Sequence, residues 1–399
     1  MSQLEQDPIV IVSAARTPLG SFQGVFASVA ATELGAVAIK AAVERAGLKP
    51  EQIDEVIMGC VLPAGLGQAP ARQATVGAGL PLSVGATTVN KVCGSGMRAM
   101  MNAHDALVAG STEIMVAGGM ESMTNAPYML PKARSGYRIG HGQIFDHMMM
   151  DGLEDAYEKG RSMGTFGEDC ADKYHFTREA QDAFAIESVK RAQQASQDDS
   201  FVAEIAPVTV TTRAGDTVVD TDEGPGKIKT EKIPSLKPAF KKDGTVTAAS
   251  SSSINDGAAA LVMMRKSKAK ALGLKPLAKM CGHATFAHAP NWFTTAPITG
   301  VERLLKKNNW SVESVDLWEI NEAFAVVPMA AMHDLNIPHS KVNVHGGACA
   351  LGHPIGASGA RIVVTLLHAL KKHGLKRGVA TLCIGGGEAT AIGVECLDD

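Results

Sequence analysis

The sequence predicts an α/β protein whose core is built twice, with a further lobe inserted between the repeats. Its 399 residues are about two to three times a typical domain, which favours more than one core or one core made twice. Short apolar runs bounded by glycine alternate with amphipathic segments, as in an α/β sheet. Three short motifs recur in the same order, at residues 47–60 and 309–322, 89–96 and 342–349, and 116–121 and 383–388.

Local patterns predict the elements of each half. Residues 33–46 repeat apolar side chains at helical spacing, and Gly47 suits the end of that helix. Residues 55–58 and 114–117 are apolar runs next to glycine, as buried strands are. Two further helices are expected over residues 96–109 and 359–370. We therefore expect in each half a mixed, largely parallel sheet covered by helices.

The middle of the chain departs from the repeat. It is rich in Met, Tyr and Pro, then shows a helix at 178–194 and strand-like Thr and Val at 208–219. A lysine-rich stretch at 227–242 ends it, and a run of serines leads back to the core. The predicted parts are an N-terminal half-core of residues 1–120 completed by 248–275, an inserted lobe of residues 121–247, and a C-terminal half-core of residues 276–399.

Composition excludes several classes of protein. The 38 basic and 41 acidic residues give a net charge of −3, which offers no broad attraction to nucleic acid or membrane surfaces. No apolar stretch reaches the ~18 residues of a membrane span, and neither end of the chain resembles a targeting signal. The seven cysteines are scattered without a Cys-x-x-Cys pair, which disfavours a disulfide framework or zinc site. We expect a soluble cytoplasmic protein.

Four short segments carry reactive or polar side chains at predicted strand ends. Cys93 lies where a strand gives way to a helix, a position at which the helix dipole and backbone N–H groups favour a thiolate. His353 stands between glycine and proline on a turn, and Asn321 ends a strand of the second half. Cys383 precedes three glycines whose N–H groups suit an oxyanion.

Taken singly, these segments also fit a buried inert cysteine, an ordinary histidine and a tight turn. Together they gather at strand ends of both halves, where open α/β sheets bind their ligands. A nucleophilic thiol, a histidine and a second thiol indicate covalent acyl transfer coupled to proton abstraction.

The sequence resembles the thiolase family over nearly its whole length. The motifs that carry the resemblance lie at residues 92–96, 117–122, 255–259, 321–324, 352–359 and 383–387. Condensing enzymes of fatty-acid synthesis share the duplicated core but usually have His or Asn where Cys383 stands. The resemblance implies two mixed sheets of the five-stranded type, layered with helices.

The resemblance also implies a reversible condensation of two acetyl-CoA molecules to acetoacetyl-CoA and CoA. His353 would take the proton of Cys93, which attacks a thioester and becomes an acyl-cysteine. Cys383 would then remove the α-proton of acetyl-CoA, while His353 and a water positioned by Asn321 hold the enolate oxygen. Backbone N–H groups of Cys93 and Gly385 would stabilise the tetrahedral intermediate. No metal or organic cofactor is implied, since CoA thioesters are the substrates.

For CoA itself, the resemblance implies that the inserted lobe binds it. The residues that match a pantetheine tunnel are Leu153, Met163, Phe240, Ala248, Ser252 and Phe324. Such side chains are equally usual in plain packing, and the lysines at 227–242 fit either CoA phosphates or a solvated face. The resemblance further implies a homodimer or homotetramer.

One position departs from the acetyl-specific type, which commonly has a histidine where this chain has Ser162. Chain length is therefore open. The alternatives to the acetoacetyl-CoA-forming activity are a 3-ketoacyl-CoA thiolase of fatty-acid β-oxidation and a non-catalytic acyl-CoA-binding subunit. The second is disfavoured because Cys93, His353 and Cys383 are all present.

Overall fold

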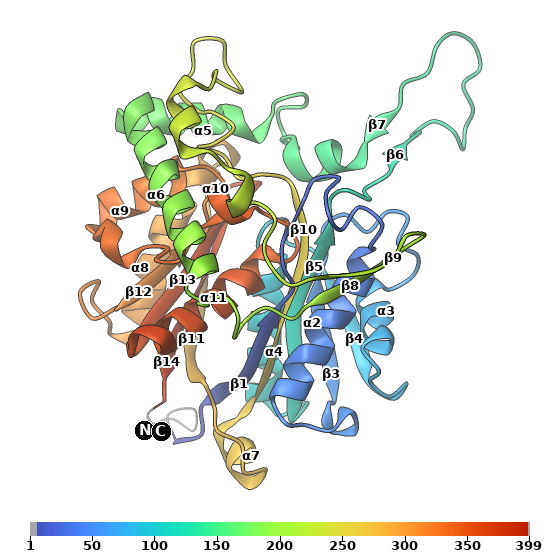
Figure 1. Ribbon diagram of the computed structural model, residues 1–399, viewed down its shortest axis with the longest axis vertical. Helices are drawn as coiled ribbons and strands as arrows, with labels where there is room; N and C mark the ends of the chain where they lie inside the picture. Colours follow the sequence, from blue (N-terminus) through green and yellow to red (C-terminus); the bar gives the residue numbers. More distant parts are fainter. Residues whose placement is uncertain (1–5, 398–399) are drawn as a thin grey trace.

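The computed structural model describes residues 6–397 and consists of a large mixed sheet with helices on its faces and between its two halves (Figure 1). The outermost residues of both chain ends, on which the prediction of no targeting signal partly rests, lie outside this range. Within it, no helix has the length and apolar character needed to cross a membrane. The predicted α/β fold class is confirmed.

The first half of the sheet has five main strands in the order β4-β3-β5-β10-β1. Strand β3 runs parallel to β4 and β5, and the other pairs are antiparallel. The short β2 (Gly20–Ser21) pairs with the start of β10. The bounds are β1 (Ile9–Arg16), β3 (Glu55–Gly59), β4 (Gly85–Val89), β5 (Ile114–Ser122) and β10 (Asn255–Arg265).

The second half repeats this order and these directions with β12, β13, β14 and β11. Their bounds are β11 (Ala278–Ala287), β12 (Leu317–Ile320), β13 (Arg377–Ile384) and β14 (Glu388–Cys396). The fifth position is a single parallel bridge between Val342 and Trp318. Pairing ends there because Asn343 has a φ of 48° and its side chain bonds the N–H and C=O of Ile320, each at 2.9 Å, in place of a neighbouring strand.

Helices form three layers around the two half-sheets. The bounds are α2 (Ala31–Arg45), α3 (Pro70–Gly77), α4 (Ser95–Ala109), α8 (Ala296–Asn308), α9 (Val326–Leu335) and α11 (Ser358–His373). One apolar cluster joins α2 and α3 to the outer face of the first half-sheet, and another joins α8 and α9 to the second. A third holds α4 and α11 between the halves. The two half-sheets meet where β1 and β11 pair over two residues only.

The middle layer brings the two motif turns together. A Cβ added at Gly96, on α4, would lie 2.9 Å from the backbone nitrogen of Ala360 on α11. A Cβ at Gly359 would lie 2.4 Å from the backbone nitrogen of Met97. These glycines therefore allow the two helix N-termini to approach closely, so that the turn before each helix faces the same space.

The inserted segment packs over one end of this core (Figure 1). It contains the predicted helix at 178–194 and the strand-like region at 208–219, which is a hairpin. The bounds are β6 (Tyr128–Met129), β7 (Phe145–Asp146), the π-turn Met149–Leu153, α5 (Met163–Tyr174), α6 (Arg178–Gln197), β8 (Val208–Thr212) and β9 (Gly215–Val219). Two further α-helices are short, α7 (Lys266–Ala271) and α10 (Ala348–Leu351). The 3-10 helices are Pro50–Gln52, Pro225–Lys227, Thr230–Ser235, Pro290–Thr295 and His339–Lys341. The domain boundaries themselves stay a prediction.

Candidate active site

Cys93 lies in a strained turn between β4 and α4. Val92, just before it, has a φ of 46°, which a β-branched residue rarely adopts. Its N–H donates to Asn90 Oδ1 at 2.9 Å, and its carbonyl accepts from Ser95 Oγ at 2.7 Å. The same Ser95 oxygen accepts the N–H of Lys91 at 2.8 Å. These bonds hold the turn and leave Cys93 half-buried.

Two backbone N–H groups, those of Gly385 and of Cys93 itself, lie near the Cys93 sulfur and lower its pKa. Burial nevertheless raises the pKa of Cys93 to about 11, because the N–H groups only partly offset the loss of solvation. The expectation that the helix N-terminus makes this residue a thiolate is therefore wrong for the resting protein. Both N–H groups thus act on the same sulfur. Their predicted role in stabilising a tetrahedral intermediate stays a prediction.

His353 is held by its backbone and by one ring nitrogen. Its N–H donates to the carbonyl of Ser253 at 3.1 Å, and its Nδ1 is 2.5 Å from Ser358 Oγ. Because that hydroxyl donates its own hydrogen to Pro354 O at 3.0 Å, it accepts from Nδ1–H. Burial, and then the positive charge of Arg361, lowers the pKa of His353 to about 3. The imidazole is thus neutral, with its proton on Nδ1 and the acceptor lone pair on Nε2.

Asn321 lies against that nitrogen, and its Nδ2 donates to His353 Nε2 at 3.5 Å. Its backbone N–H donates to Thr381 O at 3.0 Å, which fixes it beside β13. Its buried Oδ1 has no hydrogen-bond partner among the described residues. A buried acceptor of this kind suits a water molecule or a bound substrate.

Cys383 lies near the end of β13 and is 1% exposed. Burial raises the pKa of its thiol well above the usual range, and the nearby charge of an ionised Cys93 would raise it further. The glycine turn that follows includes Gly386 and Gly387 with φ values of 92° and 87°, which let the chain reverse into β14. The structure therefore brings together the predicted Cys93, His353, Cys383, Asn321 and Gly385.

Four of the six predicted tunnel residues pack on apolar clusters that reach the site. Met163, Phe240 and Phe324 belong to the cluster that contains Cys383. A Cβ added at Gly385 would lie 3.4 Å from the methyl carbon of Met163. Leu153 packs on a second cluster, against which Cys93 also packs.

The remaining two tunnel residues lie on the segment that leads back from the lobe. Ser252 donates its N–H to the carbonyl of Ala323 at 2.9 Å, and its neighbour Ser253 accepts the N–H of His353. This serine segment thus connects the strand end of Asn321 to the histidine turn. Ala248, at its start, is exposed.

Sequence reasoning gave no role to Glu121, at the end of β5, although it lies in a quoted motif. Its carboxylate accepts the N–H groups of Val61, Leu62 and Gly356 at 3.0, 3.1 and 2.9 Å. It therefore ties the first half to the turn that follows His353. Burial raises the pKa of this carboxyl to about 7. One sequence feature could have identified Glu121 as important: it is an acidic residue at the end of an apolar strand.

Glu322 was also missed, although it follows Asn321 directly. Its oxygens accept from Ser188 Oγ at 2.7 Å, Asn343 Nδ2 at 2.8 Å and the N–H of Cys349 at 3.0 Å. It therefore joins α6 of the inserted segment to the second half-core.

Two family models cover nearly the whole chain. The thiolase N-terminal domain matches residues 9–267, and the thiolase C-terminal domain matches residues 274–396. The chain belongs to the thiolase family. It is 52% identical to the acetyl-CoA acetyltransferase of Cupriavidus necator, over 97% of this chain and 99% of that protein. It is 50% identical to a probable acetyl-CoA acetyltransferase of Dictyostelium discoideum, over 98% and 94% of the two chains.

Solved thiolase structures have the same fold. The acetyl-CoA acetyltransferase of Bacillus anthracis superposes with a TM-score of 0.95 at 41% identity, over 98% of this chain and 99% of that one. Acat5 thiolase from Ascaris suum, solved in complex with coenzyme A, gives 0.92 at 44% identity, over 98% and 100%. The family predicted from the motifs is confirmed.

Proposed function

We propose that this thiolase is an acetyl-CoA acetyltransferase, which condenses two acetyl-CoA molecules to acetoacetyl-CoA and CoA and also runs in reverse. One observation carries the proposal: the N–H groups of Cys93 and Gly385 converge on the Cys93 sulfur, and the charge of that sulfur acts on the thiol of Cys383. Relatives at 50–52% identity, named as acetyl-CoA acetyltransferases, support the acetyl group as substrate.

The first half-reaction starts from neutral groups. Since burial keeps the pKa of Cys93 high and that of His353 low, the proton moves only as the sulfur attacks the thioester carbonyl. His353 Nε2 takes it. The carbon–sulfur bond to CoA then breaks, and the leaving thiolate takes the proton of Cys383. The products are acetyl-Cys93, CoA and a Cys383 thiolate that faces the His353 imidazolium.

The second half-reaction returns both protons. The Cys383 thiolate, a strong base because it is buried, removes the α-proton of the second acetyl-CoA. His353 Nε2–H and a water bound by Asn321 hold the enolate oxygen. The carbanion attacks acetyl-Cys93, the two N–H groups stabilise the oxyanion, and the departing Cys93 sulfur recovers its proton from His353.

The proposal includes a pantetheine tunnel lined by Leu153, Met163, Phe240, Ala248, Ser252 and Phe324. Its support is the packing of Met163 next to Gly385 and of Leu153 on the cluster that Cys93 borders. Binding energy of this remote arm then orients the reacting thioester. CoA thioesters are substrates here, and the proposal includes no further cofactor.

The proposal also includes a homodimer or homotetramer working in the cytoplasm, in the metabolism of acyl chains. All seven cysteines are free, as is usual in a reducing compartment. The segment formed by β6, β7 and the loop between them projects away from the core (Figure 1). It exposes apolar side chains, at Tyr128, Leu130, Ile139 and Ile144. Such side chains suit contact with another copy. Light scattering on the purified protein measures its mass and tests the assembly.

The decisive test is chemical. After incubation with acetyl-CoA, mass spectrometry should find acetyl on the Cys93 peptide, and acetoacetyl-CoA should accumulate when CoA is removed. Acetyl on Cys383, or on neither thiol, would overturn the assignment. In the thiolytic direction, activity should fall steeply beyond four-carbon substrates; a flat profile contradicts the acetyl preference while leaving the mechanism intact.

A further inference from the structure

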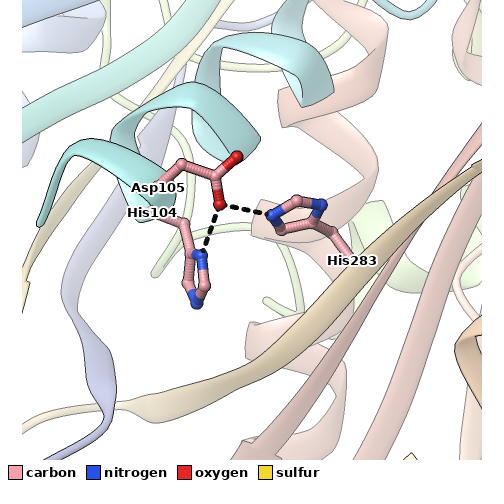
Figure 2. Close-up of side chains that lie close together, drawn as sticks. All are labelled: His104, Asp105 and His283. Carbon is pink, nitrogen blue, oxygen red and sulfur yellow. Dashed lines mark hydrogen bonds and ion pairs between the residues drawn. The ribbon is translucent and has the colours of Figure 1, made fainter. Parts of the chain in front are cut away.

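Three side chains of types that can bind metal ions lie together between the two half-cores. The proposed reaction uses none of them. His104 and Asp105 are on α4, and His283 is on β11, 178 residues beyond Asp105. Figure 2 shows one carboxylate oxygen of Asp105 between the two imidazole rings. At 1.5 Å per residue along α4, His104 lies about 15 Å from Cys93, far from the reacting atoms.

The spacing of the three groups resembles a metal-ligand set. Oδ1 of Asp105 is 3.2 Å from His104 Nδ1 and 2.9 Å from His283 Nε2. One ligand atom from each residue can be chosen so that all lie within 4.8 Å of one another. Ligands at ~2.0–2.2 Å around a tetrahedral zinc ion stand about 3.3 Å apart, so small side-chain shifts suffice.

The surroundings hold the two imidazoles in place and leave the carboxylate accessible. The side chains of His104 and His283 are only 11% and 15% exposed, whereas that of Asp105 is 56% exposed. An ion can therefore enter past the carboxylate and meet two packed imidazoles. Hydrogen bonds from both histidines outweigh burial and lower the pKa of Asp105, which keeps it an anion.

The ammonium group of Lys307 lies near the three side chains. Its charge repels a metal ion but also favours the neutral form of His104. The ammonium group of Lys307 donates a hydrogen bond to the backbone carbonyl of His283 at 3.2 Å. Burial is the main reason that the pKa of His104 is lowered; the hydrogen bond to Asp105 raises it, and His283 and Lys307 lower it. Neutral imidazole is the form that binds metals.

We propose that His104, Asp105 and His283 form a binding site for a divalent transition ion of the zinc type, with water completing the coordination. Two imidazoles and one carboxylate favour Zn²⁺, Co²⁺ or Ni²⁺ over the hard ions Mg²⁺ and Ca²⁺. The ion replaces the hydrogens now shared with Asp105, so each ring carries its proton on its other nitrogen.

Such an ion acts on the junction between the half-cores. Helix α4 belongs to the first half and β11 to the second, and β11 pairs with β1 over two residues only. An ion held by both elements adds a cross-link where the sheet ladder is short. We therefore expect it to raise thermal stability and to leave turnover unchanged, because the ligands touch none of the catalytic side chains.

The test uses the full-length protein after dialysis against EDTA, with Co²⁺ and Zn²⁺ as the probes. Titration calorimetry should show one site per chain, and Zn²⁺ should raise Tm. Asp105→Asn and His283→Gln should each weaken the Kd at least tenfold and remove the rise in Tm. The matched control is His333→Gln: His333 Nδ1 is 2.8 Å from Asp334 Oδ1, but this pair has no second imidazole.

Spectra separate this site from the cysteines. Co²⁺ bound by imidazole and carboxylate gives weak visible bands, whereas thiolate ligation adds strong near-ultraviolet charge transfer. Retained binding in both ligand variants, a thiolate band, or the absence of saturable binding would each overturn the proposal. Loss of binding in the ligand variants but not in the His333→Gln control, with the kcat of the metal-free protein unchanged, supports it.

Discussion

The two thiols of the site differ in placement although both lie at strand ends. Cys93 follows β4 in a strained turn and is half-buried. Two backbone N–H groups lie near its sulfur and lower its pKa. Cys383 lies inside the end of β13 and is 1% exposed. Burial raises the pKa of both, and for Cys383 the charge of Cys93 adds to the effect. A partly accessible sulfur can reach a carbonyl carbon, whereas a buried one becomes a strong base once it loses its proton.

We expect the largest loss of activity from substituting His353, because this residue acts in both half-reactions. His353→Ala should slow acetylation of Cys93 on the order of 10³-fold, because it removes the proposed acceptor of the sulfur's proton. It should also slow exchange of solvent deuterium into the methyl group of acetyl-CoA, since the enolate loses its partner. Rapid-quench mass spectrometry measures both. A variant that keeps either rate would contradict the shared role; His333→Ala is the control.

The next change separates the two thiols. Cys383→Ser replaces a thiol, whose ordinary pKa is ~8.5, by a hydroxyl that is a far weaker acid and does not give its proton to the leaving CoA thiolate. Deuterium exchange should fall about 10²–10⁴-fold. Acetylation of Cys93 should fall much less, because the CoA thiolate can leave without a proton from Cys383. If acetylation were lost as fully as exchange, the division of roles would be wrong.

Ser358 is a positioning residue, whose hydroxyl holds Nδ1–H of His353. Ser358→Ala should lower kcat about tenfold and leave KM unchanged, with partial rescue by Ser358→Thr.

The lowered pKa of His353, about 3, means that its neutral form persists as pH falls. Wild-type acetylation should therefore show no imidazole titration between pH 8 and 5, and the variant should keep this profile because burial is the main cause. A new acid limb near pH 6 in the wild type would contradict the assignment.

The smallest effect concerns substrate length. Ser162 precedes Met163, whose methyl group lies next to Gly385. Ser162→His fills space near the thioester, so kcat/KM for substrates longer than acetoacetyl-CoA should fall severalfold relative to acetoacetyl-CoA itself. Ser162→Thr, which adds one methyl group, serves as the control. An unchanged ratio in Ser162→His would show that this position does not limit the pocket.

Sequence reasoning reached the chemistry because the reactive residues lie in short motifs. Cys93, His353 and Cys383 were predicted from glycine-rich turns at strand ends, and the structure brings them together. The repeated strand order was likewise visible as three matching motifs. Glu121 and Ser358 received no role, because their importance lies in contacts with Val61, Leu62 and Gly356 or with the ring of His353, which no local pattern reports.

The protonation state of Cys93 also could not be predicted from a local sequence pattern. The helix N-terminus beside Cys93 predicts a thiolate, yet burial outweighs it and raises the pKa. Burial is a property of the packed molecule, since a neighbour such as Ile384 reaches the turn from the other half. His104, Asp105 and His283 were missed for a related reason: His104 and Asp105 are neighbours on α4, but His283 lies on β11, 178 residues beyond Asp105.

By itself, the sequence determined the α/β class, the duplicated core and the identity of the reactive side chains, because apolar periodicity and turn residues act over short distances. Only the tertiary structure decided which polar groups face one another, which tautomer His353 adopts and how strongly each thiol holds its proton. Those properties depend on desolvation and on hydrogen bonds such as those of His353 with Ser358 and Asn321. The close approach of α4 and α11 at Gly96 and Gly359 brings the turns of the two halves together.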